Sequence, residues 1–161
     1  MTLKQEIDFL KMITFNNMEE MITHATIQKY FSVTPNDGIE HIFKGYSDKH
    51  GQFNGYHTEI LFPNLYHPVP EPMECNKNIL YKMYLSDVKK FNTFFPLTMS
   101  CQDIITAILL AYEKSKQKTI INPRGTMHGY DCQIKEYDIH IKIIMDVNFK
   151  IFDAYPIIKS K

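Results

Sequence analysis

The chain has 161 residues, 44% of them hydrophobic and 13% aromatic, which suits one globular domain and excludes a disordered chain. Its 18 lysine and arginine residues balance 18 aspartate and glutamate residues, and this neutrality counts against nonspecific wrapping of nucleic acid, which needs a clustered basic surface. No stretch approaches the roughly 20 apolar residues of a membrane span, and the N-terminus lacks the apolar region of a signal peptide, so we expect action in the cytoplasm.

The N-terminal part is predicted to be helical. Apolar residues follow at helical spacing over residues 3–31, and Thr2 and Gln5 form a candidate capping box at the start. An Asn-Asn pair at 16–17 interrupts the pattern, so we expect a second helix over residues 18–30. Because Thr2 is the predicted N-cap, the first helix should begin directly after it.

A strong turn signal, TPNDG at residues 34–38, follows the helical part. It predicts an N-terminal helical arm over residues 1–35. The remaining residues, 36–161, should form a single compact unit.

The middle of the chain should alternate between loops and strands. Residues 41–59, HIFKGYSDKHGQFNGYHTE, are polar and punctuated by glycine, so we expect a loop, from which a strand over residues 56–62 leads out. The proline-rich residues 63–76 indicate an irregular surface excursion. Residues 79–86, ILYKMYLS, alternate as a strand does.

The C-terminal part carries the clearest helix. Ser100 caps it, Asp103 completes the capping box, and an apolar stripe predicts that it runs to about residue 116 on the surface of a sheet. Three strands should follow, over residues 130–137, 138–147 and 150–156. The predicted fold class is α+β, with one helix packed on antiparallel sheets.

Two of the seven histidines, His41 and His57, flank the polar loop, and three explanations are open. A metal site is one, but the wide spacings resemble neither HExxH nor CxxC, so we expect no metal and no cofactor. A second is a pair of proton carriers, in which one histidine removes a proton from a hydroxyl and the other protonates a leaving oxygen. The third is that both are ordinary surface histidines.

RNA suits a histidine pair because its 2′-hydroxyl is a built-in nucleophile, so neither a metal nor an activated serine is needed. Such a site also requires a group, usually cationic, that stabilises the charge growing on the phosphate. The other histidines considered, His24, His67, His128 and His140, are expected at ordinary helix, loop or strand positions.

Five segments resemble, in order, motifs of the bacterial EndoU family of ribonucleases, known as toxin domains of polymorphic and contact-dependent inhibition proteins. These segments are HIFKG, GQFNGYHTE, LYKMYLSDVK, NTFFPLTMSCQDIITAILLAYEKS and MDVNFKIFDAYPI. The resemblance covers residues 38–158. It implies an EndoU-like catalytic domain with two antiparallel sheets and a pancreatic-ribonuclease-like active site between them.

The resemblance also implies a function. We expect a metal-independent endoribonuclease that cleaves RNA at uridines by 2′-hydroxyl transesterification and leaves a 2′,3′-cyclic phosphate. His41 and His57 match the family's catalytic histidines. The implied partners are an RNA substrate, with transfer RNA among the candidates, and a cognate immunity protein, but no membrane. The implied setting is a toxin or effector delivered as part of a larger secreted protein.

Two positions depart from the family pattern. The family's lysine corresponds to Tyr84, and Lys82 lies on the same face of the predicted strand, so both are expected at the catalytic site. The family's threonine corresponds to Asp153, which could accept the N3–H of uracil, while Tyr155 keeps an aromatic position suited to stacking on a base. The alternative function is a catalytically weakened EndoU-like domain that binds RNA or a protein partner.

Overall fold

The computed structural model describes residues 1–47, 53–66, 69–71, 80–83, 91–115, 120–121, 128–146 and 148–157. The helices in these ranges are α1 (Leu3–Leu10), α2 (Met18–Ile22), α3 (Ala25–Tyr30), α4 (Ile39–Phe43) and α5 (Cys101–Ser115). The strands are β1 (Tyr46–Ser47), β2 (Phe53–Asn54), β3 (Val69–Glu71), β4 (Leu80–Met83), β5 (Phe91–Phe94), β6 (Ile120–Ile121), β7 (His128–Ile134), β8 (Ile139–Met145) and β9 (Ile151–Ile157).

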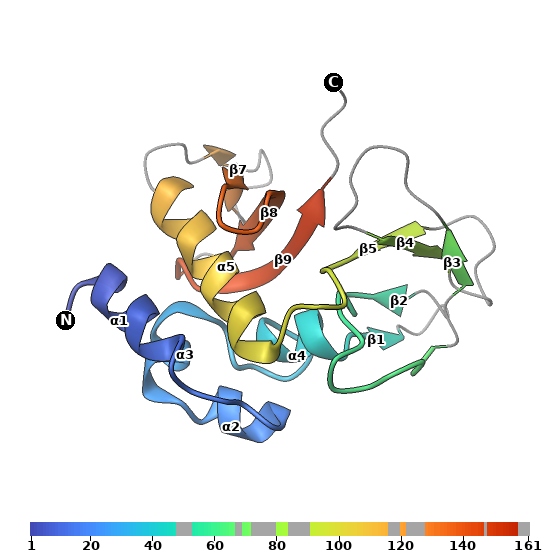
Figure 1. The fold of residues 1–161 in the computed structure, drawn as a ribbon, viewed down its shortest axis with the longest axis horizontal. Helices are drawn as coiled ribbons and strands as arrows, with labels where there is room; N and C mark the ends of the chain where they lie inside the picture. Colours follow the sequence, from blue (N-terminus) through green and yellow to red (C-terminus); the bar gives the residue numbers. More distant parts are fainter. Residues whose placement is uncertain are drawn as a thin grey trace.

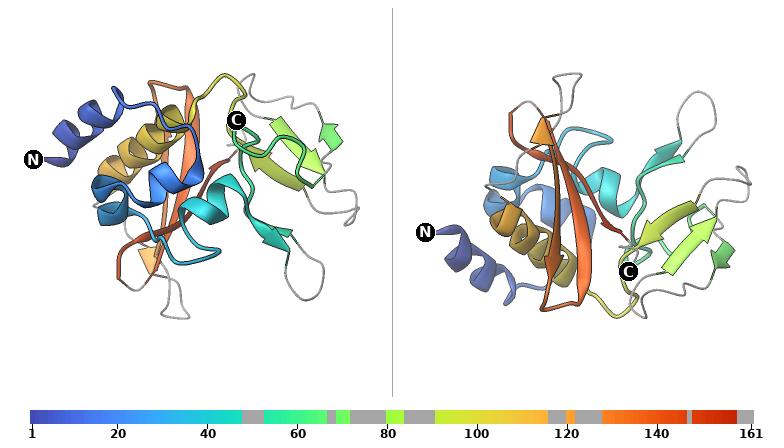
Figure 2. Two further views of the ribbon diagram at one scale, coloured as in Figure 1. Left: turned by 90° about the horizontal axis from the view of Figure 1, so that it is seen from below. Right: turned by 90° about the horizontal axis from the view of Figure 1, so that it is seen from above.

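The strands within the described ranges form three antiparallel sheets, β1-β2, β3-β4-β5 and β6-β7-β8-β9. Helix α5 lies along one face of the four-stranded sheet, beside α1 and α3 (Figure 1). The views from below and above place the two smaller sheets on the opposite side of the four-stranded sheet, with α4 next to them (Figure 2). The predicted combination of helices with antiparallel sheets is confirmed.

The capping signals read from the sequence form as expected. The Thr2 and Gln5 pair is reciprocal, with Gln5 N donating to Thr2 Oγ1 at 3.2 Å and Thr2 N donating to Gln5 Oε1 at 2.8 Å. Ser100 and Asp103 make the same exchange at the start of α5. Backbone amides in the first turn of a helix have no partner within the helix, so such caps determine where the helix begins.

The predicted helix over residues 18–30 is divided into two. His24 has extended backbone angles, and its Nδ1 accepts a hydrogen bond from Thr26 N at 3.2 Å, so it is the N-cap of α3. A side chain that caps a new helix start stabilises the break in the old one. The role of His24 is therefore structural.

The helical arm and the sheets share one hydrophobic core. Leu10, Met21 and Ile27 are fully buried in the same cluster as Ile105 of α5 and Ile141 of β8. The N-terminal helices are therefore packed against the rest of the protein in a single core. The domain boundary at residue 35 stays a prediction.

The prediction of a strand over residues 56–62 is wrong. Tyr56 has a positive φ of 64°, and its buried hydroxyl donates to Phe62 O at 2.5 Å and accepts from Leu65 N at 3.1 Å. The backbone therefore wraps around the phenol, which is incompatible with an extended ladder. The prediction that residues 63–76 are irregular throughout is also wrong in part, because Val69–Glu71 form the edge strand β3.

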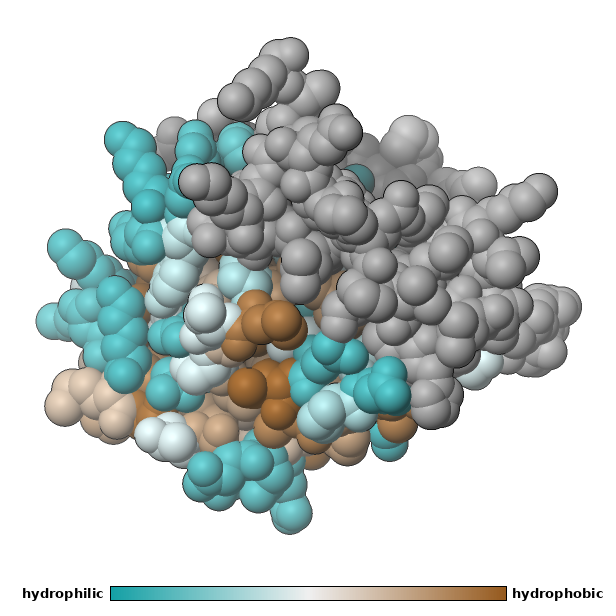
Figure 3. Space-filling view, turned by 45° about the vertical axis from the view of Figure 1, so that its right-hand side comes forward, coloured by the Kyte–Doolittle hydropathy of each residue, from teal (hydrophilic) through white to brown (hydrophobic). Residues whose placement is uncertain are grey.

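The described surface shows no broad apolar face. Exposed large hydrophobic residues are scattered, and Met12, Ile60, Leu97 and Phe149 among them lie in separate turns and loops. Among the coloured residues on the face drawn in Figure 3, the most hydrophobic ones gather in a small central group bordered by hydrophilic ones. Among the described residues, no helix has both the length and the apolar character needed to cross a bilayer.

Candidate active site

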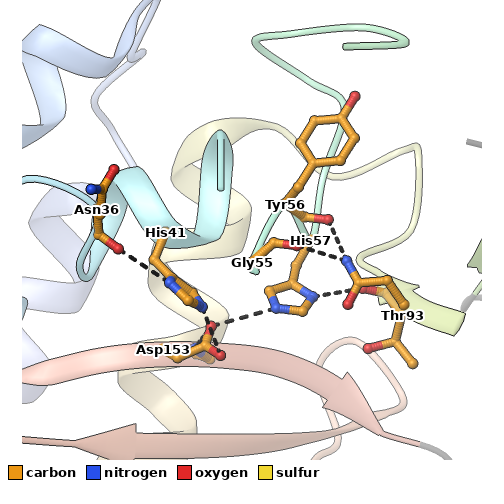
Figure 4. A network of polar contacts seen from close by, with 9 residues as sticks. Asn36, His41, Gly55, Tyr56, His57, Thr93 and Asp153 are labelled. Atoms are coloured by element: carbon orange, nitrogen blue, oxygen red, sulfur yellow. Dashed lines mark hydrogen bonds and ion pairs between the residues drawn. The ribbon is translucent and has the colours of Figure 1, made fainter. Parts of the chain in front are cut away.

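Four segments distant in sequence meet at one point. Helix α4 contributes His41, the segment after β2 contributes His57, β9 contributes Asp153, and β5 contributes the backbone of Thr93. Figure 4 shows the Asp153 side chain rising from its strand toward both imidazole rings. The centroids of the two rings lie 6.4 Å apart.

His41 lies on a helix, not in the loop expected from its glycine-rich surroundings. Gly38 precedes this helix with a positive φ of 58°, and an added Cβ there would lie 1.9 Å from Ser32 O, so only glycine allows this turn. The Nδ1 atom of His41 lies 3.2 Å from Asn36 O. The His41 side chain is 7% exposed, so the ring is held inside the protein and not on a mobile loop.

His57 is held by backbone contacts on both sides. Its amide donates to Ile42 O at 2.8 Å, its carbonyl accepts from Phe95 N at 2.7 Å, and its Nδ1 lies 2.8 Å from Thr93 O. The side-chain amide of Asn92 adds two bonds, to Gly55 O at 2.8 Å and Tyr56 O at 2.7 Å. Strand β5 thus fixes the segment that carries His57.

Gly55 permits the close approach of the two histidine segments. Its φ is 76°, and an added Cβ would lie 2.0 Å from His41 O and 2.9 Å from His41 Cδ2. Tyr56 N donates to the same His41 carbonyl at 2.8 Å. Any side chain at position 55 would therefore push α4 and its histidine away.

Asp153 lies between the histidines. Its Oδ2 is 3.2 Å from His41 Nε2, its Oδ1 is 3.5 Å from His57 Nε2, and Oδ1 also accepts from Ala154 N at 2.8 Å. The residue is only 7% exposed. A buried carboxylate is costly unless it is paired and hydrogen-bonded, and here both histidines and a backbone amide face it.

The hydrogen-bond partners indicate which nitrogen of each ring carries a hydrogen. Carbonyl oxygens only accept, so Nδ1 of both His41 and His57 carries the hydrogen that points at Asn36 O and Thr93 O. Each Nε2 then faces Asp153. A proton on that Nε2 gives a charge-assisted bond, whereas a lone pair there faces a carboxylate oxygen and repels it.

The pKa values shift accordingly. Burial lowers the pKa of His41, but the hydrogen bond and charge of Asp153 outweigh burial and raise it above its ordinary value. Burial raises the pKa of Asp153, but the charge of His57 and the hydrogen bonds of both histidines hold it far below its usual range. The site therefore favours an ionised aspartate next to a protonated His41.

Tyr155 stacks on His57, with ring centroids 5.0 Å apart and an angle of 25° between the ring planes. Burial and the neighbouring charge of Asp153 both raise the pKa of its hydroxyl, so this phenol is neutral. Tyr155 thus borders the histidine pair and is only partly buried, while its stacking on a base stays a prediction.

The other two candidate residues, Lys82 and Tyr84, lie partly or wholly outside the described residues. Lys82 is on β4, opposite Pro70 of β3 and Asn92 of β5, but its side chain is outside the described part. Tyr84 lies outside the described residues altogether. The catalytic roles of both stay predictions.

Sequence reasoning missed three residues that hold the site, Asn36, Asn92 and Thr93. Two of them act through backbone carbonyls, which no side-chain pattern can reveal. The signal for Asn92 was its place in the NTFFP segment, which resembles a family motif. Strand β5 itself was not predicted.

The three buried side chains could also hold a metal ion. One ligand atom from each of His41, His57 and Asp153 lies within 4.8 Å of the other two. The wide spacing along the chain gave no indication of this grouping, because Asp153 approaches only through the tertiary fold. Imidazole and carboxylate together suit transition metals such as zinc better than calcium or magnesium.

A family model described as bacterial EndoU nuclease matches residues 35–158. The chain belongs to the bacterial EndoU nuclease family. The resemblance read from the sequence is confirmed, and the matched range contains all the side chains of the candidate site in this EndoU nuclease.

Solved structures give a second comparison. The EndoU nuclease is similar to XendoU, described as a splicing-independent snoRNA-processing endoribonuclease, with a TM-score of 0.51 and 16% identity. The match covers 98% of this chain and 63% of the XendoU chain. At this identity the likeness shows a shared fold. No curated protein sequence matches the chain.

Proposed function

We propose that the protein is an endoribonuclease that cleaves RNA without a metal, through attack of the 2′-hydroxyl on the adjacent phosphate. The observation that carries this proposal is the pair of buried imidazoles, 6.4 Å apart and linked by one carboxylate. Two histidines at this spacing could reach the attacking and the leaving oxygen of one phosphodiester. Membership of a nuclease family supports this chemistry, and so does the fold shared with an endoribonuclease.

The two histidines take different roles. His41, whose pKa is raised, enters the reaction protonated and gives its proton to the leaving 5′-oxygen. His57 takes the proton from the 2′-hydroxyl, so that the new P–O bond closes a 2′,3′-cyclic phosphate as the bond to the 5′-oxygen breaks. Because Nε2 of each ring now faces Asp153, substrate must draw these nitrogens toward its own oxygens.

Asp153 is a positioning residue in this scheme. Its carboxylate holds both rings and keeps His41 protonated, which favours this role over a contact with the substrate. The contact of Asp153 with the N3–H of uracil stays a prediction. Tyr155 supplies a ring beside His57 on which a uracil base could stack.

Charge on the phosphate requires a stabilising group, and Lys82 is the cation on the strand where the family carries its lysine. Tyr84, at the position of that lysine, could donate a hydrogen bond but brings no positive charge. Strand β4, which carries Lys82, pairs with β5, and β5 in turn contacts β9. This places the backbone of Lys82 one strand from the histidine segment.

The biological setting follows from the family resemblance. We propose a toxin or effector nuclease that acts in the cytoplasm on cellular RNA, with transfer RNA among the candidates, after delivery within a larger secreted protein. A cognate immunity protein is the corresponding partner.

A uridine-containing oligonucleotide, incubated with the protein in excess EDTA, tests the chemistry. We expect cleavage at uridines and a product with a 2′,3′-cyclic phosphate, identified by mass spectrometry. An oligonucleotide with deoxyuridine at the cleavage position is the control and should stay intact. A 5′-phosphate product that disappears on chelation contradicts the proposal.

One observation favours the second candidate, a weakened domain that binds RNA without cutting it. Both Nε2 atoms already face the same carboxylate, so neither ring is free of Asp153 in this structure. Binding of the oligonucleotide without cleavage at any pH between 5 and 8 would support this candidate.

A further inference from the structure

We propose that His41, His57 and Asp153 also form an inhibitory zinc(II) site. The three side chains are buried, converge from α4, the segment after β2 and β9, and offer two imidazole nitrogens and a carboxylate oxygen. Two histidines and one carboxylate are a common zinc set, with an open fourth position for water. The inhibitory part rests on the proposed function, whereas the binding part does not.

The geometry is close to what zinc requires. Zinc bonds of about 2.0–2.2 Å in a tetrahedron place ligand atoms about 3.4 Å apart. His41 Nε2 lies 3.2 Å from Oδ2 of Asp153, and His57 Nε2 lies 3.5 Å from Oδ1 of the same carboxylate. With one carboxylate oxygen taken as the ligand, all three ligand atoms lie within 4.8 Å of each other. Because the histidines contact different oxygens of one carboxylate, a rotation of that carboxylate or of one ring would bring all three ligand atoms onto one ion.

The surroundings of the rings also suit a metal. Each Nδ1–H is directed at a backbone carbonyl, Asn36 O for His41 and Thr93 O for His57. This contact presents Nε2 as the free lone pair and is the usual support of a metal-binding histidine. When both rings are neutral, the lone pairs of the two Nε2 atoms face the ionised Asp153 and repel it. A divalent cation bound between them would be coordinated by both nitrogens and by a carboxylate oxygen.

Zinc in this position would stop cleavage, because it occupies the same Nε2 atoms that move protons. The nuclease would then need no metal and would nevertheless respond to one. Magnesium, which prefers oxygen ligands and retains its water, should not compete.

Calorimetric titration of the folded protein with zinc chloride at pH 7.5 tests the binding directly. We expect one zinc per chain, and a rise in melting temperature with zinc concentration. His41→Ala, His57→Ala and Asp153→Asn should each weaken binding by roughly 100-fold or more, since even a residue that only supports a ligand costs about 10–100-fold. His24→Asn, which keeps a capping side chain on α3, should bind zinc as the wild type does.

The melting temperature of each variant without zinc shows whether it is folded, and His41→Gln and His57→Gln replace any alanine variant that is not. Zinc should inhibit cleavage at the concentrations at which it binds, and EDTA should restore the activity. Equal binding by the wild type and the Asp153→Asn variant overturns the site, and activation by zinc overturns inhibition. If zinc binds at this site but the protein cleaves no RNA, the zinc site stands and only the proposed function fails.

A separate observation, the register of the four-stranded sheet, points to Lys142 as a phosphate-binding residue. Lys142 of β8 pairs directly with Tyr155 of β9, and Ile144 pairs with Asp153. Paired residues of an antiparallel ladder lie on one face, with Cβ atoms about 4.5–5.5 Å apart. Lys142 therefore lies on the active-site face, next to the tyrosine that stacks on His57.

The burial pattern of β8 supports this placement. Ile139, Ile141 and Ile143 point into the core, whereas Lys142 between them is exposed on the other face. A long, exposed ammonium side chain beside Tyr155 suits the phosphate of a nucleotide whose base stacks there. The role rests on the proposed function, since it requires RNA at this site.

The salt dependence of oligonucleotide binding tests this role. Lys142→Ala should weaken binding and reduce the slope of log affinity against log salt by about 0.7, the contribution of one neutralised phosphate on a single strand. Lys142→Arg should restore the slope, and Lys4→Ala on the remote helix α1 should leave it unchanged. An unchanged slope in Lys142→Ala overturns the proposal. The cleavage assay in EDTA tests the proposed function separately.

Discussion

The carboxylate of Asp153 lies 3.2 Å from Nε2 of His41, and both side chains are buried. The interaction raises the pKa of the imidazole and lowers that of the carboxyl, so each group stabilises the charged form of the other. It connects the fold with the proposed chemistry, because a protonated His41 is the group that can give a proton to the leaving oxygen.

Asp153→Asn should weaken the proton donor while preserving the shape of the site. Without the carboxylate charge, the pKa of His41 falls, so the basic limb of the kcat/KM profile should move to lower pH. The rate at neutral pH should fall by about 10–100-fold, as for other residues that orient a functional histidine. A pH profile measured on a uridine oligonucleotide checks this, and an unshifted basic limb contradicts it.

The same pair makes stability depend on pH. The folded-state pKa of His41 is above its unfolded value, so its contribution is complete below the ordinary histidine pKa and is lost as pH rises through the raised value. The pKa of Asp153 is lowered, so its contribution is present above the ordinary aspartate pKa and is lost at lower pH. Urea unfolding of the wild type should give a lower free energy of unfolding at pH 8 than at pH 5, because the contribution of His41 is lost. The difference between the two pH values should be smaller in Asp153→Asn.

Replacing either catalytic candidate should abolish most of the cleavage. His41→Ala and His57→Ala should each cost about 10²–10⁴-fold in rate, the usual contribution of one positioned acid or base. Because both rings are buried, melting temperatures must be measured in parallel, and assays run well below them. His24→Asn is the control histidine variant and should cleave normally. A similar rate loss in that control would indicate a general folding defect.

Gly55→Ala should reduce activity more than its effect on stability explains. The new Cβ would meet His41 O at 2.0 Å, and the positive φ adds strain of about 1–3 kcal/mol. Ile139→Ala, a buried and remote change that costs about 2–5 kcal/mol, is the destabilising control. At a temperature where both variants are folded, only Gly55→Ala should have lost cleavage. Equal activity of Gly55→Ala and Ile139→Ala would show that cleavage does not depend on the close approach of α4 to the segment that carries His57.

Lys82→Ala should lower kcat with little change in substrate affinity if its ammonium stabilises charge in the transition state. Tyr84→Phe should have a smaller effect, because a phenol brings a hydrogen bond but no positive charge. Lys4→Ala on α1 serves as the control. Wild-type rates for Lys82→Ala would place the stabilising cation elsewhere, with Lys142 and then Lys77, Lys89 and Lys90 as the next residues to replace.

Local chemistry in the sequence determined much of the fold. The capping pairs Thr2 with Gln5 and Ser100 with Asp103 set two helix starts, because caps satisfy backbone amides that the helix itself cannot. Alternating burial along β8 followed from the period of two in a strand. The two histidines were identified by residue type together with the family motifs around them.

Only the tertiary structure decided how those histidines are placed and which groups they contact. Asp153 meets them because β9 passes beneath α4, and the carbonyl of Thr93 orients His57 because β5 passes beside the loop. Tyr56 turned a predicted strand into a loop through hydrogen bonds of its buried hydroxyl. Such contacts join residues far apart in the chain and often use backbone atoms, so they cannot be predicted from the spacing of side chains along the sequence.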